Sequence, residues 1–205
     1  MIHKVTILYF IVCNMNIIIV GGGTAGWMTA TTLLSEFPNK KITLVESPNI
    51  SNIGVGESTV AGGQSGFQGI ANWLNLVGIN DLDFMPHCDS IYKLSIAFKD
   101  WYRKDSGTFH YPFGRPFLEG NKADLNDWYF KKFLYPDTPT SNYSECLFPQ
   151  MGLVNNNTLC SNEDGKLPGF DLRQDVAYQF DATKFGLWLK EHYCLPRGVH
   201  HILSE

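Results

Sequence analysis

The 205-residue sequence has few of the features that mark nucleic-acid-binding, zinc-binding or membrane-spanning proteins. It has no long basic run, and its net charge of −4 does not suit a protein whose main partner is nucleic acid. Its 5 cysteines are odd in number and too few for a disulfide framework, and they form no C-x-x-C pair, so we expect no metal site. The apolar run Val5–Cys13 is too short to cross a bilayer, which takes about 20 residues. We therefore expect a globular, cytoplasmic protein without a membrane segment.

Residues 1–14 precede a second methionine, Met15. No small-residue cleavage site follows their apolar run, which does not favour a secretory signal. The next apolar segment begins at Asn16, directly after Met15, and leads into a glycine-rich turn. We expect residues 1–14 to be a non-native upstream extension. An intact mass of the native protein that includes Met1 would contradict this expectation.

A glycine-rich turn lies between a predicted strand and a predicted helix. The β-branched run Asn16–Val20 predicts a strand that is buried on both faces of a parallel sheet. The next segment, Gly21–Gly26, matches G-x-G-x-x-G, and apolar residues then recur at helical spacing as far as Phe37. Such a turn lets a pyrophosphate approach the helix N-terminus, where N–H groups favour anions. The candidate cofactor-binding residues of the turn are Gly21, Gly23, Thr24, Ala25 and Gly26.

Glu46 ends a second predicted strand, Lys41–Val45. A carboxylate at this place in a βαβ unit accepts hydrogen bonds from ribose hydroxyls and repels a 2′-phosphate, which makes NADP the least suitable dinucleotide. A merely flexible glycine loop would leave the two flanking elements and Glu46 unexplained. The sequence therefore predicts a dinucleotide site, although these residues alone do not choose between FAD and NAD.

A second glycine-rich segment, Ile53–Thr59, follows closely. Its glycines would let the main chain lie against a flat ligand, whereas the alternative is a loop that is only flexible. Glu57 has the chemistry of a general base, but a hydrogen bond to the backbone or the cofactor is the favoured role. The candidate cofactor-binding residues here are Gly54, Val55, Gly56, Glu57 and Ser58.

Four stretches together are far more specific than a generic dinucleotide fingerprint. They are GGGTAGWM at Gly21–Met28, IGVGEST at Ile53–Thr59, YKLSIAFKDW at Tyr92–Trp101 and HYPFG at His110–Gly114. In this order they resemble the N-terminal part of the flavin-dependent tryptophan halogenases. The resemblance implies an α/β, Rossmann-like FAD-binding fold of the aromatic-hydroxylase type. It also implies that Gly21–Gly26 holds the pyrophosphate, that Glu46 binds the ribose, and that Gly54–Thr59 covers the flavin.

The resemblance implies an enzyme that halogenates tryptophan or a related electron-rich aromatic ring. In this family a separate flavin reductase supplies reduced FAD, which with oxygen and halide gives hypohalous acid, and a lysine relays the halogen. Alternation alone makes Tyr92–Trp101 one amphipathic strand on which Lys93 and Lys99 are equivalent solvated lysines. The resemblance selects Lys93 as the catalytic lysine. The alternatives are a flavin-dependent monooxygenase of the same fold and a truncated, non-catalytic FAD-binding remnant.

The family's W-x-W-x-I-P signature has no match in the sequence. We therefore expect residues 15–205 to be the N-terminal part of a single halogenase domain whose C-terminal part is absent. The fold would then be incomplete, and the coding sequence after codon 205 would show whether the signature follows. Prolines and asparagines interrupt residues 121–171, which predicts a loop-rich inserted region on the substrate side.

Overall fold

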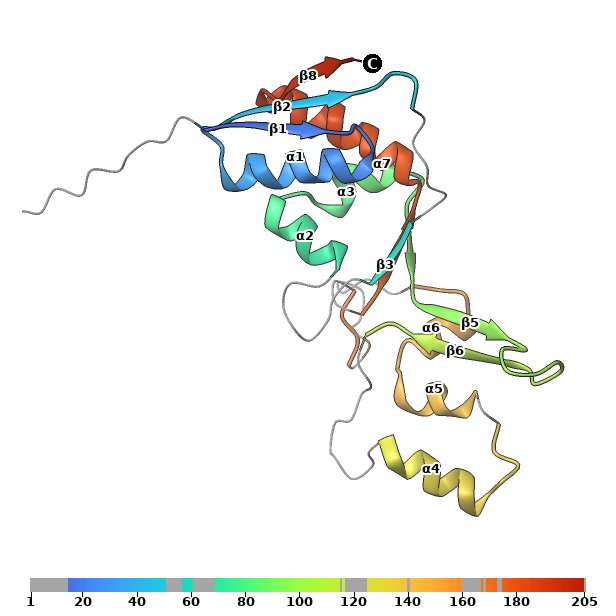
Figure 1. Cartoon of the computed structure of the whole chain (residues 1–205). Helices are drawn as coiled ribbons and strands as arrows, with labels where there is room; N and C mark the ends of the chain where they lie inside the picture. The colour runs from blue at the N-terminus through green and yellow to red at the C-terminus, as the bar shows by residue number, and fades with distance from the viewer. Residues whose placement is uncertain are drawn as a thin grey trace, which may run out of the picture. The chain divides into compact units, whose positions relative to one another are not determined.

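The chain divides into two units, one formed by its ends and the other by its middle (Figure 1). The first unit takes residues up to Ile53 and from Gly186 onward, and the second takes Gly54–Phe185. The predicted extension over residues 1–14 and the predicted cofactor residues Gly54, Val55 and Gly56 lie outside the described residues. The structure, a computed structural model, describes residues 15–50, 57–60, 69–114, 116, 125–139, 141–159, 167, 169–172 and 175–204.

Three parallel strands in the order β1-β2-β8 form the sheet of the first unit (Figure 1). Ile19 of β1 is in register with Leu44 of β2, and Leu44 with His201 of β8. A 13-residue helix, α1, connects β1 to β2 and provides the crossover that parallel neighbours require. The strands are β1 (Asn16–Val20), β2 (Lys41–Glu46) and β8 (His200–Leu203).

A helical layer packs on this sheet through apolar side chains. In α1, Trp27, Ala30 and Leu34 are buried and lie three or four residues apart, which places them on one face of the helix. This helix contacts β2 and the π-helical segment η2. The elements of the layer are α1 (Thr24–Glu36), η2 (Leu189–Cys194) and the short η3 (Leu195–Arg197).

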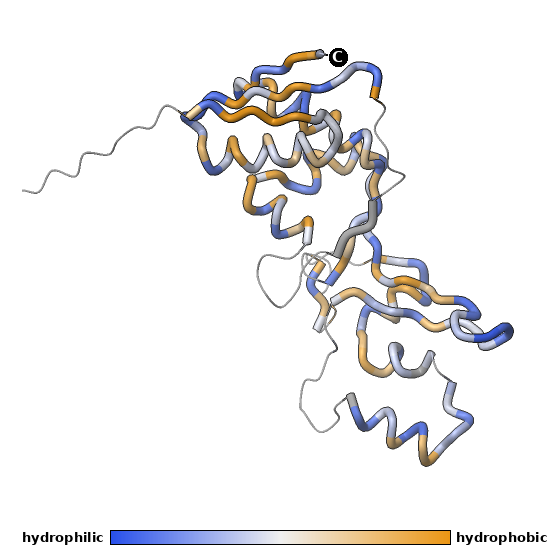
Figure 2. The backbone as a smooth tube through the Cα atoms, in the orientation of Figure 1, coloured by the Kyte–Doolittle hydropathy of each residue, from blue (hydrophilic) through white to orange (hydrophobic). Residues whose placement is uncertain are grey.

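The prediction that β1 is buried on both faces is wrong. Ile18 and Val20, which share one face of the strand, are 68% and 85% exposed. Within the described chain β1 pairs with β2 along one edge only. The strand is apolar (Figure 2), yet one of its faces is exposed and one of its edges is unpaired within the described residues. We call this exposed face and unpaired edge the open side of β1.

Two small antiparallel sheets and several short helices form the second unit. Phe84 lies at the centre of an aromatic cluster, with its ring 5.3 Å from that of Phe185 and 5.9 Å from that of Tyr178. The first sheet has the order β3-β7-β4. Its strands are β3 (Glu57–Val60), β7 (Ala177–Phe180) and β4 (Ile91–Lys93). The neighbouring helices are α2 (Ile70–Val77), α3 (Asp81–Phe84), η1 (Met85–His87) and α7 (Ala182–Trp188), whose last residues belong to the first unit.

The single strand predicted over Tyr92–Trp101 is instead two strands in two sheets. β4 pairs with β7, whereas β5 pairs with β6 as a hairpin. The break falls at Leu94, whose carbonyl accepts a 2.9 Å hydrogen bond from the N–H of Phe113. The hairpin strands are β5 (Ser95–Lys99) and β6 (Thr108–Pro112).

Short helices occupy the segment predicted to be rich in loops. None of these helices has more than ten residues. The connections contain Pro136, Pro139 and Pro149, whose pyrrolidine rings there interrupt no helical hydrogen bonds. Within the described ranges no helix has the length and apolar character needed to cross a membrane. The helices are α4 (Leu125–Leu134), α5 (Asn142–Leu147) and α6 (Met151–Asn155).

Candidate dinucleotide and lysine sites

The glycine turn between β1 and α1 can be built only with glycine at its key positions. Gly21 has φ = 115° and donates its N–H to the carbonyl of Val45 at 2.8 Å. A Cβ on Gly26 would lie 1.9 Å from the carbonyl oxygen of Gly21, so a side chain there would force the helix away from the turn. The N-cap of α1 is Gly23, which has no side chain of its own to cap the helix, and a helix N-terminus favours anions.

The carboxylate of Glu46 lies against this turn. A Cβ on Gly22 would fall 1.4 Å from its Oε2, which shows how closely the side chain approaches the main chain. Its Oε1 accepts hydrogen bonds from Nζ of Lys190 at 3.1 Å and from Nε2 of His201 at 2.6 Å. The Glu46 side chain is 18% exposed. The structure thus brings together the turn and the acid that the sequence singles out.

Trp27 supports both partners of Glu46. The ammonium of Lys190 lies 5.5 Å from the centre of the Trp27 ring, and the His201 ring packs edge-on at 5.4 Å. Lys190 and His201 are 144 and 155 residues from Glu46 in the chain, and no local motif marks either of them. Sequence reasoning therefore missed them.

These residues fit the adenosine half of a dinucleotide such as FAD. A Cβ on Gly21 would meet no described atom within 4 Å, which leaves room for a pyrophosphate against the main chain there. The carboxylate of Glu46 beside the turn has the acceptor chemistry that a ribose hydroxyl needs. The sequence places Glu57 and Ser58 in a glycine-rich loop. In the structure their backbone belongs to strand β3 and pairs with Phe180 and Gln179. The pairing with β7 fixes that backbone in a sheet.

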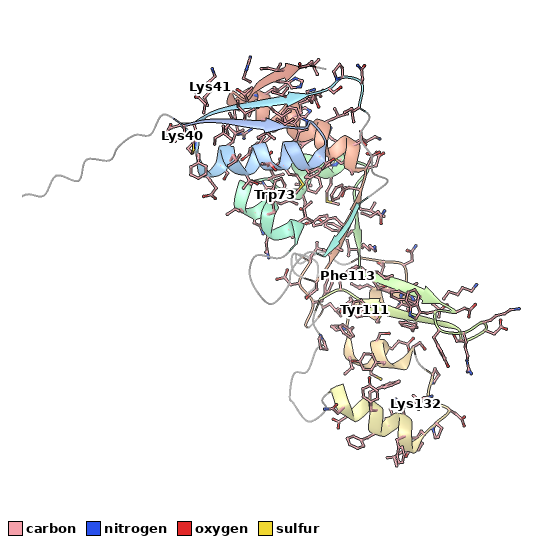
Figure 3. The ribbon with its side chains drawn as sticks, in the orientation of Figure 1. Lys40, Lys41, Trp73, Tyr111, Phe113 and Lys132 are labelled. Atoms are coloured by element: carbon pink, nitrogen blue, oxygen red, sulfur yellow. The ribbon has the colours of Figure 1, made fainter. Side chains whose placement is uncertain are left out.

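Lys93 ends strand β4 in the second unit and lies over an aromatic ring. Its Nζ is 5.6 Å from the centre of the ring of Phe113, a buried residue directly after β6 (Figure 3). The carbonyl of Phe113 accepts a hydrogen bond from Nε2 of Gln150, which is fully buried. Lys93 is half-buried whereas Lys99 is exposed, so the structure distinguishes two lysines that alternation makes equivalent.

Strand β4 is anchored beside Lys93 by a shared carboxylate. The hydroxyl of Tyr92 donates to Oδ2 of Asp81 at 2.7 Å, and the hydroxyl of Tyr178 donates to Oδ1 at 2.8 Å. The two tyrosines face each other across β4 and β7, with ring centres 5.6 Å apart. This network fixes the end of β4 from which Lys93 projects.

The buried thiols are poor nucleophiles. Burial raises the pKa of Cys88 to about 12, with further contributions from Asp181 and Asp89. Burial also raises the pKa of Cys194, whose Sγ lies 3.3 Å from Oγ1 of Thr31. Both thiols are protonated near neutral pH, which leaves them without a role as thiolates.

The family model described as tryptophan halogenase matches residues 16–205, almost the whole chain. The chain belongs to the tryptophan halogenase family. It is 31% identical to the tryptophan 6-halogenase ThaL of Streptomyces albogriseolus over 93% of its own length and 36% of that protein. It is 39% identical to the tryptophan 7-halogenase RebH of Lentzea aerocolonigenes over 45% of its length and 17% of that protein. The resemblance noted in the sequence is confirmed.

Solved structures support the fold of this halogenase-family chain. It matches the tryptophan 6-halogenase SttH of Streptomyces toxytricini with a TM-score of 0.73 and 31% identity, over 93% of this chain and 35% of that one. It matches Xcc4156, a flavin-dependent halogenase from Xanthomonas campestris, with a TM-score of 0.72 and 25% identity, over 93% and 35%. The predicted Rossmann-like fold is confirmed, and the chain spans a little over a third of its relatives' length.

Proposed function

We propose that this chain carries the dinucleotide site and the relay lysine of an FAD-dependent enzyme that halogenates tryptophan or a related electron-rich ring. The observation that carries the proposal is the contact between Glu46 and the turn at Gly22, within a chain of the halogenase family. Residues 15–205 would be the N-terminal part of one halogenase domain, and residues 121–171 its insertion. The buried thiols of Cys88 and Cys194, which form no disulfide, suit a reducing compartment such as the cytoplasm.

FAD would be held by main chain at its pyrophosphate and by a carboxylate at its ribose. Gly21, Gly23, Thr24, Ala25 and Gly26 form the turn that would receive the pyrophosphate, and Glu46 would accept a hydrogen bond from the ribose. When bound and reduced by a separate flavin reductase, FAD with oxygen and halide would supply hypohalous acid.

Lys93 would bind hypohalous acid through its ammonium. Nζ would donate a hydrogen bond to the oxygen of the acid. This bond draws electron density toward the oxygen and leaves the halogen more electrophilic toward the aromatic ring of the substrate. A ring carbon of the substrate then takes the halogen, the ring loses its proton, and the oxygen leaves as water. The ring of Phe113, 5.6 Å from Nζ, shields one side of the lysine from solvent.

A Lys93→Ala variant tests the assignment, with Lys99→Ala as the matched control. Each variant is supplied with reduced FAD, oxygen, chloride and tryptophan, and products are measured by mass spectrometry. Lys93→Ala should abolish chlorotryptophan while FAD binding, followed by visible absorbance, is unchanged. Lys99→Ala should retain both. Full chlorination by Lys93→Ala would exclude the relay role. An oxygenated product that persists in Lys93→Ala would favour a flavin-dependent monooxygenase.

A second candidate is a chain that binds FAD without catalysis, which is the expected behaviour of an incomplete domain, since both faces of a parallel sheet are covered in a complete one. Ile18 and Val20 present apolar surface on a strand that pairs along one edge within the described chain. Such a chain would bind FAD in the absorbance assay but form no halogenated product under any supply of reduced flavin. A protein that neither retains nor takes up FAD would contradict both candidates.

A further inference from the structure

Glu46 accepts hydrogen bonds from side chains of two other elements of the first unit, η2 and β8. From this arrangement we infer that Lys190 and His201 are positioning residues, which hold Glu46 ready for a ribose hydroxyl of an adenine dinucleotide. The inference rests on the proposed cofactor site and assigns roles to two residues outside its motifs. Neither residue needs to touch the ligand, because both act through the carboxylate.

The two oxygens of Glu46 have different surroundings. Oε1 accepts both hydrogen bonds, from Lys190 and from His201, whereas Oε2 lies beside the main chain of Gly22. One oxygen thus fixes the side chain, and the other is placed at the turn that would hold the pyrophosphate. A glutamate has several rotatable bonds, and fixing them before binding removes part of the entropic cost of association.

Trp27 restrains the two side chains that donate hydrogen bonds to Glu46. Its buried ring is packed against both the Lys190 ammonium, at 5.5 Å, and the His201 ring, at 5.4 Å. The side chains of Lys190 and His201 are 20% and 15% exposed, so the hydrogen bonds to Glu46 are largely shielded from water. Partly buried charged hydrogen bonds are stronger than those on the surface.

The same contacts change how the site would discriminate between ligands. The charge of Lys190 balances that of Glu46, so the carboxylate no longer acts as an isolated negative charge beside the turn. Repulsion of a 2′-phosphate, the basis of the sequence argument against NADP, is correspondingly weakened. Selection would depend on the hydrogen bond from a free ribose hydroxyl to a carboxylate held in one place.

Calorimetric titration of the 205-residue chain with ADP and with 2′,3′-dideoxy-ADP tests the inference. Lys190→Met and His201→Phe remove the two donors, and His201→Phe keeps a ring against Trp27. Both should weaken ADP binding about threefold to tenfold, the range expected for one mobilised side chain. Binding of the dideoxy compound should not change, because it has no ribose hydroxyl. His201→Gln, which keeps a donor, should restore much of the ADP affinity.

Lys41→Met is the matched control, since Lys41 is an exposed lysine at the opposite end of β2 (Figure 3). It should leave both affinities unchanged. ADP affinity that is unaffected in Lys190→Met and His201→Phe would overturn the positioning role alone. An equal loss for ADP and its dideoxy analogue would also overturn it, because that loss does not pass through Glu46. A wild-type chain that binds no ADP would overturn the cofactor site as well.

Discussion

Replacement of Gly22 by alanine should displace Glu46 and expose how much stability its contacts contribute. Gly22 lies outside the left-handed region, so alanine adds no backbone strain there. Its new Cβ would fall 1.4 Å from Oε2 and 2.5 Å from Cβ of Glu46. Because the second contact is at the base of the side chain, a change of the terminal torsion does not relieve it. Glu46 must leave its position, and its bonds to Lys190 and His201 break.

The expected loss follows from these contacts. Hydrogen bonds to charged groups contribute about 1.5–3 kcal/mol each, and an overpacked contact costs about 1–3 kcal/mol. Glu46 is 18% exposed, so water replaces part of the lost bonding. We therefore take the lower end for the two hydrogen bonds and expect Gly22→Ala to lower the free energy of unfolding by about 3 kcal/mol, or the melting temperature by about 6–12 °C.

Urea unfolding followed by circular dichroism measures this change, with Gly152→Ala as the control. A Cβ on Gly152, a helical residue of α6, meets nothing within 4 Å, so alanine there should be neutral or stabilise by about 1 kcal/mol. In the double variant Gly22→Ala/Glu46→Ala the clash disappears, and the combined loss should be smaller than the sum of the single losses. Equal stability of Gly22→Ala and wild type, or strict additivity, would refute the placement of Glu46.

Two further predictions concern the second unit. Asp81→Ala removes the acceptor of two tyrosine hydroxyls and should lower the free energy of unfolding, measured in urea, by about 2–4 kcal/mol. Tyr92→Phe removes one hydrogen bond and should lower it by about 1 kcal/mol. Equal losses in the two variants would contradict a shared acceptor. Cys88 keeps its proton in the folded state up to about pH 12, whereas the unfolded thiol loses it near pH 9. Stability should therefore fall between pH 9 and pH 12, by about 1.4 kcal/mol per pH unit from this group. The slope should be shallower in Cys88→Ala, and identical slopes would exclude a buried thiol.

The parts of the site that sequence could predict are local in the chain. The turn Gly21–Gly26 and the acid Glu46 lie in one βαβ unit, whose geometry follows from glycine conformation and helix spacing. His201 reaches Glu46 through the pairing of β8 with β2, and Lys190 reaches it from η2, which packs on α1. The periodicity of these segments encodes neither contact. Their role is a product of tertiary structure.

The two wrong predictions have a common physical origin. Alternation along Tyr92–Trp101 describes an extended chain, but it contains no information on which strand each half pairs with. The chain changes sheets at Leu94, which separates Lys93 from Lys99. Likewise, the apolar run of β1 shows that the strand favours burial, whereas its exposure depends on which elements cover each face of the sheet.

The open side of β1 has a consequence for the behaviour of the protein in concentrated solution. Within the part of the chain that the structure describes, one edge of β1 is unpaired, and such an edge is a template for another extended segment. The exposed apolar side chains of Ile18 and Val20 make such pairing favourable. The net charge of −4 is small and offers little repulsion between copies. Colloidal stability should therefore depend on this five-residue strand more than on overall charge, and lysine at position 18 or 20 would be the most direct way to improve it.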